Sequence, residues 1–423
     1  MSRKPPRVLL VGTADTKAAE LSFLADAIAA LGADSRTMDV GVLGTPGTAV
    51  HASAAEVATA AGHTLSEVRA SGDENEAMTR MARGASRLAA GMHARGEIDG
   101  VLVIGGTMGT DLALDVAGAL PMGVPKLLLS TIAHSHLIPP ERVAPDLIAM
   151  LWAGGLYGIN AVCEATLRTA AGAIVGACRA RAPIRRDRPL IGMTSFGASA
   201  LTYMIRLKPA LDERGFELAV FHATGMGGRA FESLSRGGAF AAVMDFCLQE
   251  VCNHVHGSVV SSGASRLTGA GEAGVPQLVA PGAIDMIDFA GHLPLPEPVR
   301  SRPARAHNRL LQSVAATAEE RRASAAHIAC CLARAKGPLH LMLPLRGVEQ
   351  WDRPGEALHD PQALAAFFEE LDRRLPPTVD VTRIDAHIND DAFTDAVLAR
   401  FDRWVDDGTI RRDGSHGAWG SRT

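Results

Sequence analysis

The chain has 423 residues with a formal net charge of −4 at pH 7, and 47% of the residues are hydrophobic. This length exceeds the roughly 100–200 residues of one domain and predicts two. The charge balance offers no Lys/Arg-rich face for a phosphate backbone, which argues against nucleic acid as a partner. Six cysteines without a C-x-x-C motif are too sparse for a disulfide framework and indicate reduced thiols.

Neither end of the first domain carries a targeting or spanning pattern. The apolar run at the N-terminus stops after Val11, which is too short for a secretory signal. The apolar segment Leu147–Cys163 is shorter than the ~20 residues of a spanning helix and is broken by glycines. We expect a buried helix or an interface segment there, and a soluble, cytoplasmic protein with no membrane partner.

The first domain is expected over residues 1–180. Apolar runs predict strands at Val8–Val11, Ser35–Val42, Val101–Ile104 and Lys126–Ser130. Apolar residues at helical spacing predict helices within 18–32, 52–62, 74–96 and 159–180. Strands that alternate with helices indicate an α/β fold with a mainly parallel sheet and right-handed crossovers.

A charged, proline-containing stretch at 181–189 reads as a linker, after which the strand–turn–helix pattern starts again. The second α/β domain is expected over 190–405. Its predicted strand-to-turn segments are 190–199, 217–230, 239–246, 257–265, 277–285, 339–347 and 379–390. Residues 292–309 read as a long Pro/Arg loop, and 406–423 as a flexible tail.

Two segments of the first domain, 7–24 and 99–117, share the order of apolar strand, Gly/Thr loop with an Asp, and helix. Glycine lets a ligand approach the backbone, and the free N–H groups of a helix N-terminus attract phosphate. Neither loop is a Walker A or a G-x-G-x-x-G motif. The pair still predicts a nucleotide site built from Gly12, Thr13, Asp15, Thr16, Lys17, Asp39, Gly105, Gly106, Thr107, Gly109 and Thr110. In this prediction Asp39 contacts a ribose; the alternative is that Thr13 or Asp15 only caps a helix.

The second domain carries a glycine-rich loop with an imidazole and a guanidinium, which together suit a carboxylate or phosphate. Segments that follow other predicted strands are expected to face the same crevice. The predicted second site consists of His222, Thr224, Gly225, Gly227, Gly228, Arg229, Ser261, Gly263 and Asp285. The alternative is a flexible loop with a solvent-facing Arg229.

Two histidine clusters raise the question of a metal. Cys252, His254 and His256 would share one face of a strand, but "FCLQEVCNHVH" reads better as a helix that runs into a loop. His134 and His136 form a similar pair without further ligand spacing. We therefore predict no metal site. Glu250 is a candidate acid–base residue, or else a solvated glutamate on a helix.

Five segments together resemble the Tm-1-like (UPF0261) family: "VLLVGTADTKAAEL", "VIGGTMGTDLAL", "PKLLLSTIA", "FHATGMGGRAFESL" and "PQLVAPGAIDMIDF". The resemblance continues through "LPLRGVEQWDRPGEALHDP". It implies two Rossmann-like domains, ATP binding in the first domain and a homodimer. Mg²⁺ is a possible companion of the ATP. Plant relatives carry a further TIM barrel. Since this chain ends at Thr423 without one, such a function would need a separate TIM-barrel protein as partner.

Three functions remain open on this basis. The main hypothesis is an ATP-binding protein with a second crevice for an anionic ligand. The first alternative is an enzyme, metal-assisted or not, that acts on a small anionic carbonyl compound or a phosphorylated metabolite. It would use His222, Arg229 and Glu250. The second alternative is a dimeric interaction module that nucleotide stabilises.

Overall fold

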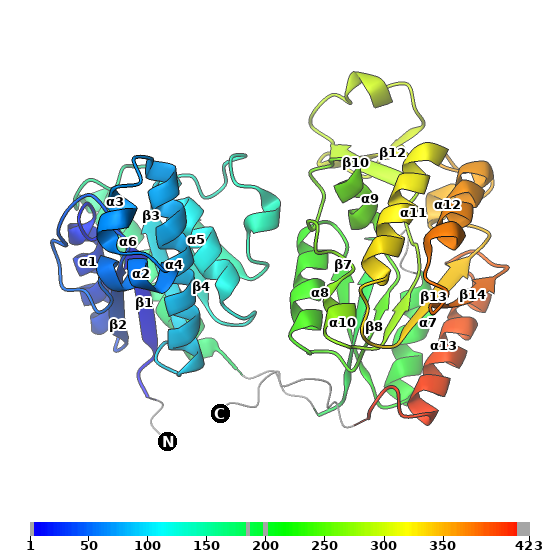
Figure 1. Cartoon of the computed structure of the whole chain (residues 1–423), viewed down its shortest axis with the longest axis horizontal. Coiled ribbons are helices and arrows are strands. Elements are labelled where there is room, and N and C mark those ends of the chain that lie inside the picture. The colour runs from blue at the N-terminus through cyan, green and yellow to red at the C-terminus, as the bar shows by residue number, and fades with distance from the viewer. Residues whose placement is uncertain (1–3, 183–186, 198–201, 413–423) are drawn as a thin grey trace. The chain divides into compact units, whose positions relative to one another are not determined.

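The computed structural model describes residues 4–182, 187–197 and 202–412. The chain divides into two compact units, Met1–Pro183 and Ile184–Thr423, which are described separately (Figure 1). Parts of the predicted linker and tail, residues 183–186 and 413–423, lie outside the described residues.

Within residues 4–182 the strands form one parallel sheet in the order β2-β1-β3-β4-β5. The strands are β1 (Arg7–Gly12), β2 (Asp34–Asp39), β3 (Gly100–Gly105), β4 (Lys126–Ser130) and β5 (Leu147–Leu151). The helices are α1 (Ala18–Ala30), α2 (Ala54–Ala61), α3 (Leu65–Arg69), α4 (Glu74–Ala94), α5 (Thr107–Ala119) and α6 (Ala161–Ala180), with a 3-10 turn η1 (Pro140–Arg142).

Helices cover both faces of this sheet because alternate strand residues point to opposite sides. Leu9, Val11 and Val103 pack with buried residues of α2, α4 and α5. Leu10 and Ile104 pack with α1 and α6 on the other face. The four predicted strands of this domain are present.

The prediction of a buried helix at Leu147–Cys163 is wrong, whereas the alternative of an interface segment there stays a prediction. The segment begins with the edge strand β5, in which Ile148 is 44% and Leu151 46% exposed. Among the described helices, α6 has the length and apolar composition of a membrane span. It packs its buried face, with Leu167 and Ile174, into the core of the domain, as core helices of globular domains do.

The second unit contains a parallel sheet in the order β14-β13-β9-β8-β6-β7, counted over its described residues. Its strands are β6 (Leu190–Ser195), β7 (Glu217–His222), β8 (Ala242–Asp245), β9 (Gln277–Val279), β13 (Leu339–Pro344) and β14 (Asp380–Ile384). The helices are α7 (Thr202–Glu213), α8 (Met226–Arg236), α9 (Gln249–Val255), α10 (Gly269–Glu272), α11 (Ala318–Leu332), α12 (Pro361–Arg374) and α13 (Asp391–Asp406). Residues of α7 and α13 pack on one face, and those of α11 and α12 on the other. The predicted fold class, α/β with two Rossmann-like domains, is confirmed.

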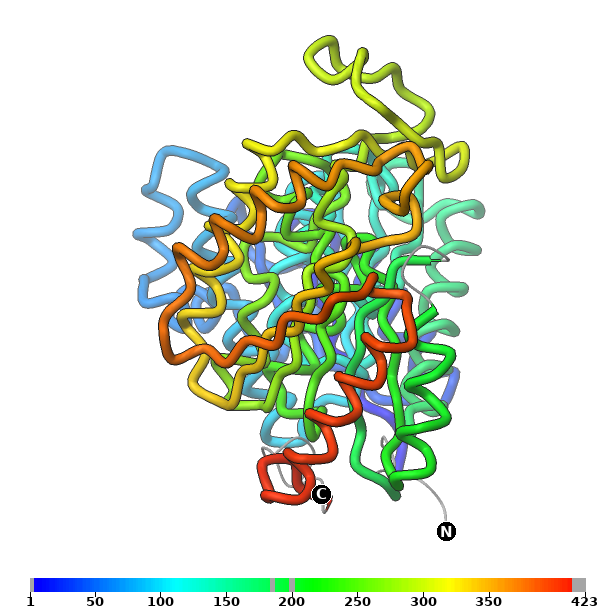
Figure 2. The backbone as a smooth tube through the Cα atoms, turned by 90° about the vertical axis from the view of Figure 1, so that its right-hand side faces the viewer, coloured from blue at the N-terminus to red at the C-terminus, as the bar shows by residue number. Residues whose placement is uncertain are grey.

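A small antiparallel sheet in the second unit is absent from the predictions. Strands β10 (Met286–Ala290), β12 (Leu311–Ala315) and β11 (Ala304–Ala306) pair in the order β10-β12-β11. Residues 292–309, predicted as loop alone, thus contain β11 and a 3-10 turn η3 (Glu297–Val299). The connection between β10 and β12 projects from its domain (Figure 2). The strand predicted within 257–265 does not form.

Each parallel sheet reverses its strand order once. In the first sheet the chain moves outward from β1 to β2 on one side and to β3, β4 and β5 on the other. In the second, β6 and β8 flank the same kind of reversal. Ligands of open α/β sheets bind outside the carboxyl ends of the strands at this point, so a ligand of the first sheet is expected at the loops after β1 and β3.

Candidate functional site

The loops that follow β1 and β3 lie side by side at the reversal of the first sheet. A Cβ atom on Gly12 would lie 3.2 Å from Ile104 Cγ1, and one on Gly105 would lie 2.6 Å from Gly109 Cα. Glycine at these positions therefore lets β1, β3 and the first turn of α5 come close together. The structure brings the two predicted loops into one place.

The N-terminus of α5 is the part of this site that is open to a ligand. Its N-cap is Gly106, whose lack of a side chain leaves the helix without a side-chain cap. The first intrahelical bond runs from Thr110 N to Gly106 O at 2.8 Å. The N–H groups of Thr107, Met108 and Gly109 precede it and have no acceptor within the helix. Together with the helix dipole they favour an anion.

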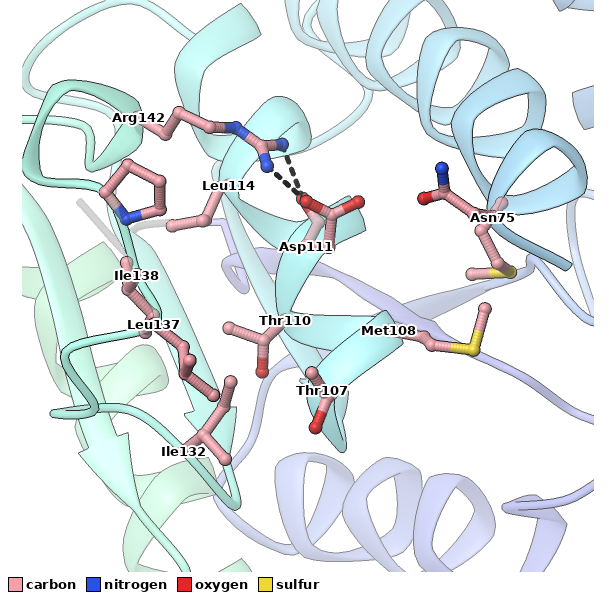
Figure 3. A pocket seen from close by; sticks show the side chains of 12 residues that line it. Asn75, Thr107, Met108, Thr110, Asp111, Leu114, Ile132, Leu137, Ile138 and Arg142 are labelled. Atoms are coloured by element: carbon pink, nitrogen blue, oxygen red, sulfur yellow. Dashed lines mark hydrogen bonds and ion pairs between the residues drawn. The ribbon is translucent and has the colours of Figure 1, made fainter.

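A pocket of about 230 Å³ adjoins this helix end. In Figure 3, Ile132, Leu137 and Ile138 line one side, and Met108 lies toward Asn75 on the other. Further lining residues are Met78, Thr107, Thr110, Asp111, Leu114, Pro139 and Arg142. The site thus combines an anion-attracting helix end with mostly apolar walls, as nucleotide pockets do.

Two polar contacts fix the pocket. Thr110, which is 1% exposed, shares a hydrogen bond of 2.6 Å between its Oγ1 and Ser130 Oγ at the end of β4. Arg142 pairs with Asp111 and, at 2.7 Å, with Asp115, so it ties the segment after β4 to α5. The Asp111 carboxylate is thereby neutralised beside the site.

The loop Gly12–Lys17 is held by its own chain at several points. Asp15 Oδ2 accepts hydrogen bonds from Leu43 N and Gly44 N at 2.8 and 3.0 Å. Thr13 and Thr16 share a hydrogen bond of 2.6 Å between their hydroxyls. Lys17 Nζ donates to Leu156 O at 3.1 Å and lies 5.6 Å from the centre of the Tyr157 ring. A phosphate contact of these residues stays a prediction.

Asp39 has a clear function within the loop region. Its Oδ1 accepts hydrogen bonds from Ala14 N and Gly41 N, both at 2.8 Å, which ties the loops after β1 and β2 together. Burial raises the pKa of this carboxyl, while the two backbone donors lower it. Contact of Asp39 with a ribose stays a prediction.

The glycine-rich loop of the second domain surrounds a carboxylate of the chain itself. Glu250 Oε1 accepts hydrogen bonds from Gly225 N at 2.5 Å and Gly228 N at 3.1 Å. A Cβ atom on Gly228 would lie 1.7 Å from Glu250 Oε2, and one on Gly227 would lie 1.8 Å from His222 O. These glycines therefore permit close packing within the chain at the N-terminus of α8.

Glu250 belongs to a buried charge network centred on Arg266. The guanidinium, 1% exposed, pairs with Glu250 at 2.8 Å, Asp245 at 2.5 Å and Glu232 at 3.2 Å. Burial raises the pKa of Glu250, and Arg266 opposes that rise. Since Glu250 is fully buried and paired with Arg266, the alternative of a solvated glutamate on a helix is wrong, and an acid–base role of Glu250 stays a prediction.

The other residues predicted for the second crevice separate into two places. Ser261 lies beside Gly225, since a Cβ on Gly225 would lie 3.2 Å from Ser261 O, and Gly263 N donates to Ser261 Oγ at 3.0 Å. Asp285 is fully buried near Glu349 instead. A ligand that contacts this loop stays a prediction. His222 is exposed and Thr224 and Arg229 are half-buried, so these three residues are the ones that a ligand at this loop could contact.

The residues of the two histidine clusters that were considered for a metal do not all lie together. Cys252 is buried on α9, where burial raises its pKa to about 12. His254 Nδ1 lies 3.4 Å from Ser261 Oγ, whereas His256 Nε2 lies 3.0 Å from Glu320 O. His134 and His136 are both exposed. In the described part of the chain, no three His, Cys, Asp or Glu side chains are placed to hold a metal ion.

Sequence reasoning missed the pocket walls and the carboxylate network. Ser130 is the last residue of a predicted strand, and residues that follow strand ends, such as Thr110, were predicted for the site. The same reasoning could have selected Ser130. Asn75, Arg142 and Arg266 gave no such signal, because each meets its partners only through the tertiary fold.

Comparison with known proteins identifies the family. The N-terminal domain of the uncharacterised protein family UPF0261 matches residues 6–183, and its C-terminal domain matches residues 188–405. A UPF0261 protein of Brucella melitensis is 50% identical over 405 residues, covering 96% of this chain and 97% of the relative. A UPF0261 protein of Clostridium tetani is 33% identical and covers 93% and 98% of the two chains.

Two more distant similarities complete the comparison. The tomato ToMV resistance protein Tm-1(GCR237) is 32% identical over 310 residues, which is 71% of this chain and 41% of that protein. A crystal structure of a putative UDP-N-acetylglucosamine 2-epimerase from Listeria monocytogenes is 12% identical, covering 65% of this chain and 79% of the other. Its TM-score of 0.22 is too low to carry an argument. The matches over both domains show that the chain belongs to the uncharacterised protein family UPF0261.

Proposed function

We propose that this protein is a cytoplasmic ATP-binding protein, and that the N-terminus of α5 holds the phosphates. The observation that carries the proposal is the uncapped helix end at Gly106, which lies at the strand-order reversal and beside a pocket. The resemblance to the Tm-1-like family supports ATP as the nucleotide. The hydroxyl of exposed Thr107 adds a donor at the same helix end.

The pocket and the neighbouring loop suit the rest of a nucleotide. The apolar side chains Met108, Ile132 and Ile138 offer a surface for a planar base. Lys17 and Thr16 lie on the adjacent loop, where an ammonium and a hydroxyl favour phosphate oxygens. A Mg²⁺ ion bound with ATP would be held chiefly by phosphate oxygens and water, as is usual for this metal.

Calorimetric titration and thermal unfolding with ATP, ADP, AMP and inorganic phosphate test this function. We expect ATP to bind and to raise the unfolding temperature, because a ligand at 100 times its Kd stabilises the folded state by about 2.7 kcal/mol. Absence of binding by all four compounds, with and without Mg²⁺, would contradict the proposal.

The Lys17→Met variant tests the adjacent loop. If Lys17 exchanges its bond to the Leu156 carbonyl for a phosphate oxygen, its loss should weaken ATP binding by about 1.5–3 kcal/mol. Stability should change little because Lys17 is only half-buried. Unchanged affinity in the titration would remove Lys17 from the site and leave the α5 site intact.

The homodimer, the second anionic ligand and a separate TIM-barrel partner stay predictions. Several exposed apolar residues follow one another in the sequence, in the edge strand β5 and in the segment after it. Among them, Tyr157 is 95% and Val162 is 65% exposed. They make this region the first place to look for a subunit contact.

A further inference from the structure

A second group of buried charges in the C-terminal domain involves Asp285 and Glu349. Asp285 ends the loop after β9, and Glu349 lies in the loop after β13. Both side chains are fully buried, and none of their four carboxyl oxygens has a hydrogen-bond partner. Buried polar atoms in proteins nearly always have partners, so this arrangement requires an explanation.

The two carboxyl groups face each other closely enough for a hydrogen bond between them. Two ionised carboxylates in this position would repel each other strongly, because burial removes the screening by water. One proton between them removes half of the charge and supplies the missing hydrogen bond.

The surrounding charges favour one proton. Arg321 on α11 is fully buried, and its two terminal nitrogens have no hydrogen-bond partner. Its positive charge acts on Asp285. With one proton shared by the two carboxyls, the three side chains are together neutral. The other titratable groups that face the set are Cys252 on α9 and Asp352, whose Oδ1 lies 3.0 Å from His387 Nε2.

A divalent cation fits this set less well. The described residues contain no group of three His, Cys, Asp or Glu that could hold a metal ion. The positive charge of Arg321 also opposes a second cation.

From this geometry we propose that Asp285 and Glu349 form a proton-binding site, a buried carboxyl dyad that holds one proton in neutral solution. The proton joins the loop after β9 to the loop after β13. Its loss leaves two buried negative charges beside one arginine and weakens the C-terminal domain. This inference is independent of the nucleotide site in the other domain.

The pH dependence of stability has a definite sign. Burial, with the negative charge of Asp352, raises the pKa of Asp285 to about 7, and burial, with the negative charge of Asp285, raises the pKa of Glu349 to about 10. In the unfolded chain both ionise near pH 4. Between pH 7.5 and 9.5 the pair thus holds one more proton in the folded state than in the unfolded state. This proton alone should lower the folding equilibrium constant of the C-terminal domain about tenfold per pH unit.

Denaturant unfolding of the full chain at several pH values between 7.5 and 9.5 measures this slope, and infrared spectroscopy detects the protonated carboxyl directly. We expect the Glu349→Gln variant to lose the part of the slope that one proton contributes, about tenfold per pH unit, together with the carboxyl band of the pair. The part of the slope that comes from the buried thiols Cys247 and Cys252, whose pKa values burial raises, should remain in the variant. The Glu369→Gln variant, which changes an exposed glutamate of α12, should behave as wild type. If Glu349→Gln does not fold, the double variant Asp285→Asn/Glu349→Gln replaces it, with the same expectation.

Two results would overturn the proposal. One is a Glu349→Gln variant whose slope and carboxyl absorption equal those of the wild type, which would show that the pair holds no proton in the wild type. The other is stabilisation by millimolar Mg²⁺, Ca²⁺ or Mn²⁺ that disappears in Glu349→Gln, which would make the pair a cation site.

Discussion

The Arg266→Met variant is expected to lose the folded C-terminal domain. The guanidinium of Arg266 neutralises Asp245, Glu250 and Glu232, all of which are nearly inaccessible to solvent. Methionine replaces the aliphatic stem of arginine but carries no charge, so three buried carboxylates would remain without their cation. Breaking one buried ion pair typically destabilises a protein by about 3–5 kcal/mol. Whole domains are stable by only about 5–15 kcal/mol.

Soluble yield, circular dichroism and urea unfolding measure this effect. The matched control is Arg188→Met, which removes a surface pair with Asp212 whose side chains are 45% and 48% exposed. Exposed pairs contribute about 0–1 kcal/mol, so the control should unfold close to the wild-type midpoint. Similar midpoints for the two variants would show that the Arg266 network contributes little to the domain.

The Gly105→Ala variant is expected to disturb the first domain at the candidate site. The added Cβ would lie 2.6 Å from Gly109 Cα and 3.0 Å from Gly109 C, both backbone atoms of α5. Since backbone cannot rotate aside, α5 must move away from the end of β3. We expect a loss of about 2–3 kcal/mol, in the range of other overpacking changes, together with weaker ATP binding.

Gly118 provides the control on the same helix. A Cβ there meets nothing within 4 Å, and alanine favours helix more than glycine does. Gly118→Ala should therefore be neutral or slightly stabilising in urea unfolding and should bind ATP as wild type does. Equal stability of the two alanine variants would contradict the close approach of α5 to β3.

Local sequence patterns identified the elements that carry the nucleotide proposal. Apolar runs located β1, β3 and β4, and the glycines that follow them marked the places where chain segments approach closely. Strand β5 was not predicted because its sequence continues into the apolar stretch before α6, so that no polar residue marks where the strand ends. The small sheet of β10, β11 and β12 was not predicted because its strands lie beside or within a Pro/Arg-rich connection that reads as a loop.

The buried charged residues could not be predicted from local sequence patterns. Glu232, Glu250 and Arg266 are far apart in the chain and read separately as helix or loop residues. Only the fold shows that Glu250 faces Arg266 and the loop at Gly225, rather than solvent. The same holds for Asp285, whose partner Glu349 lies after another strand of the sheet.

The most direct test of the central claim compares ATP binding by Gly106→Asp and Gly106→Ala. The N-cap position has φ −77°, and a Cβ there would lie 3.8 Å from Thr131 Oγ1, so the backbone and the space at this position accept a Cβ atom. Aspartate is a strong N-cap that satisfies the free N–H groups of α5 with its own carboxylate. By calorimetry we expect Gly106→Asp to stay folded but lose at least tenfold in ATP affinity, which is about 1.4 kcal/mol. Gly106→Ala should bind ATP nearly as wild type does. Wild-type affinity in Gly106→Asp would show that the phosphates do not bind at the N-terminus of α5.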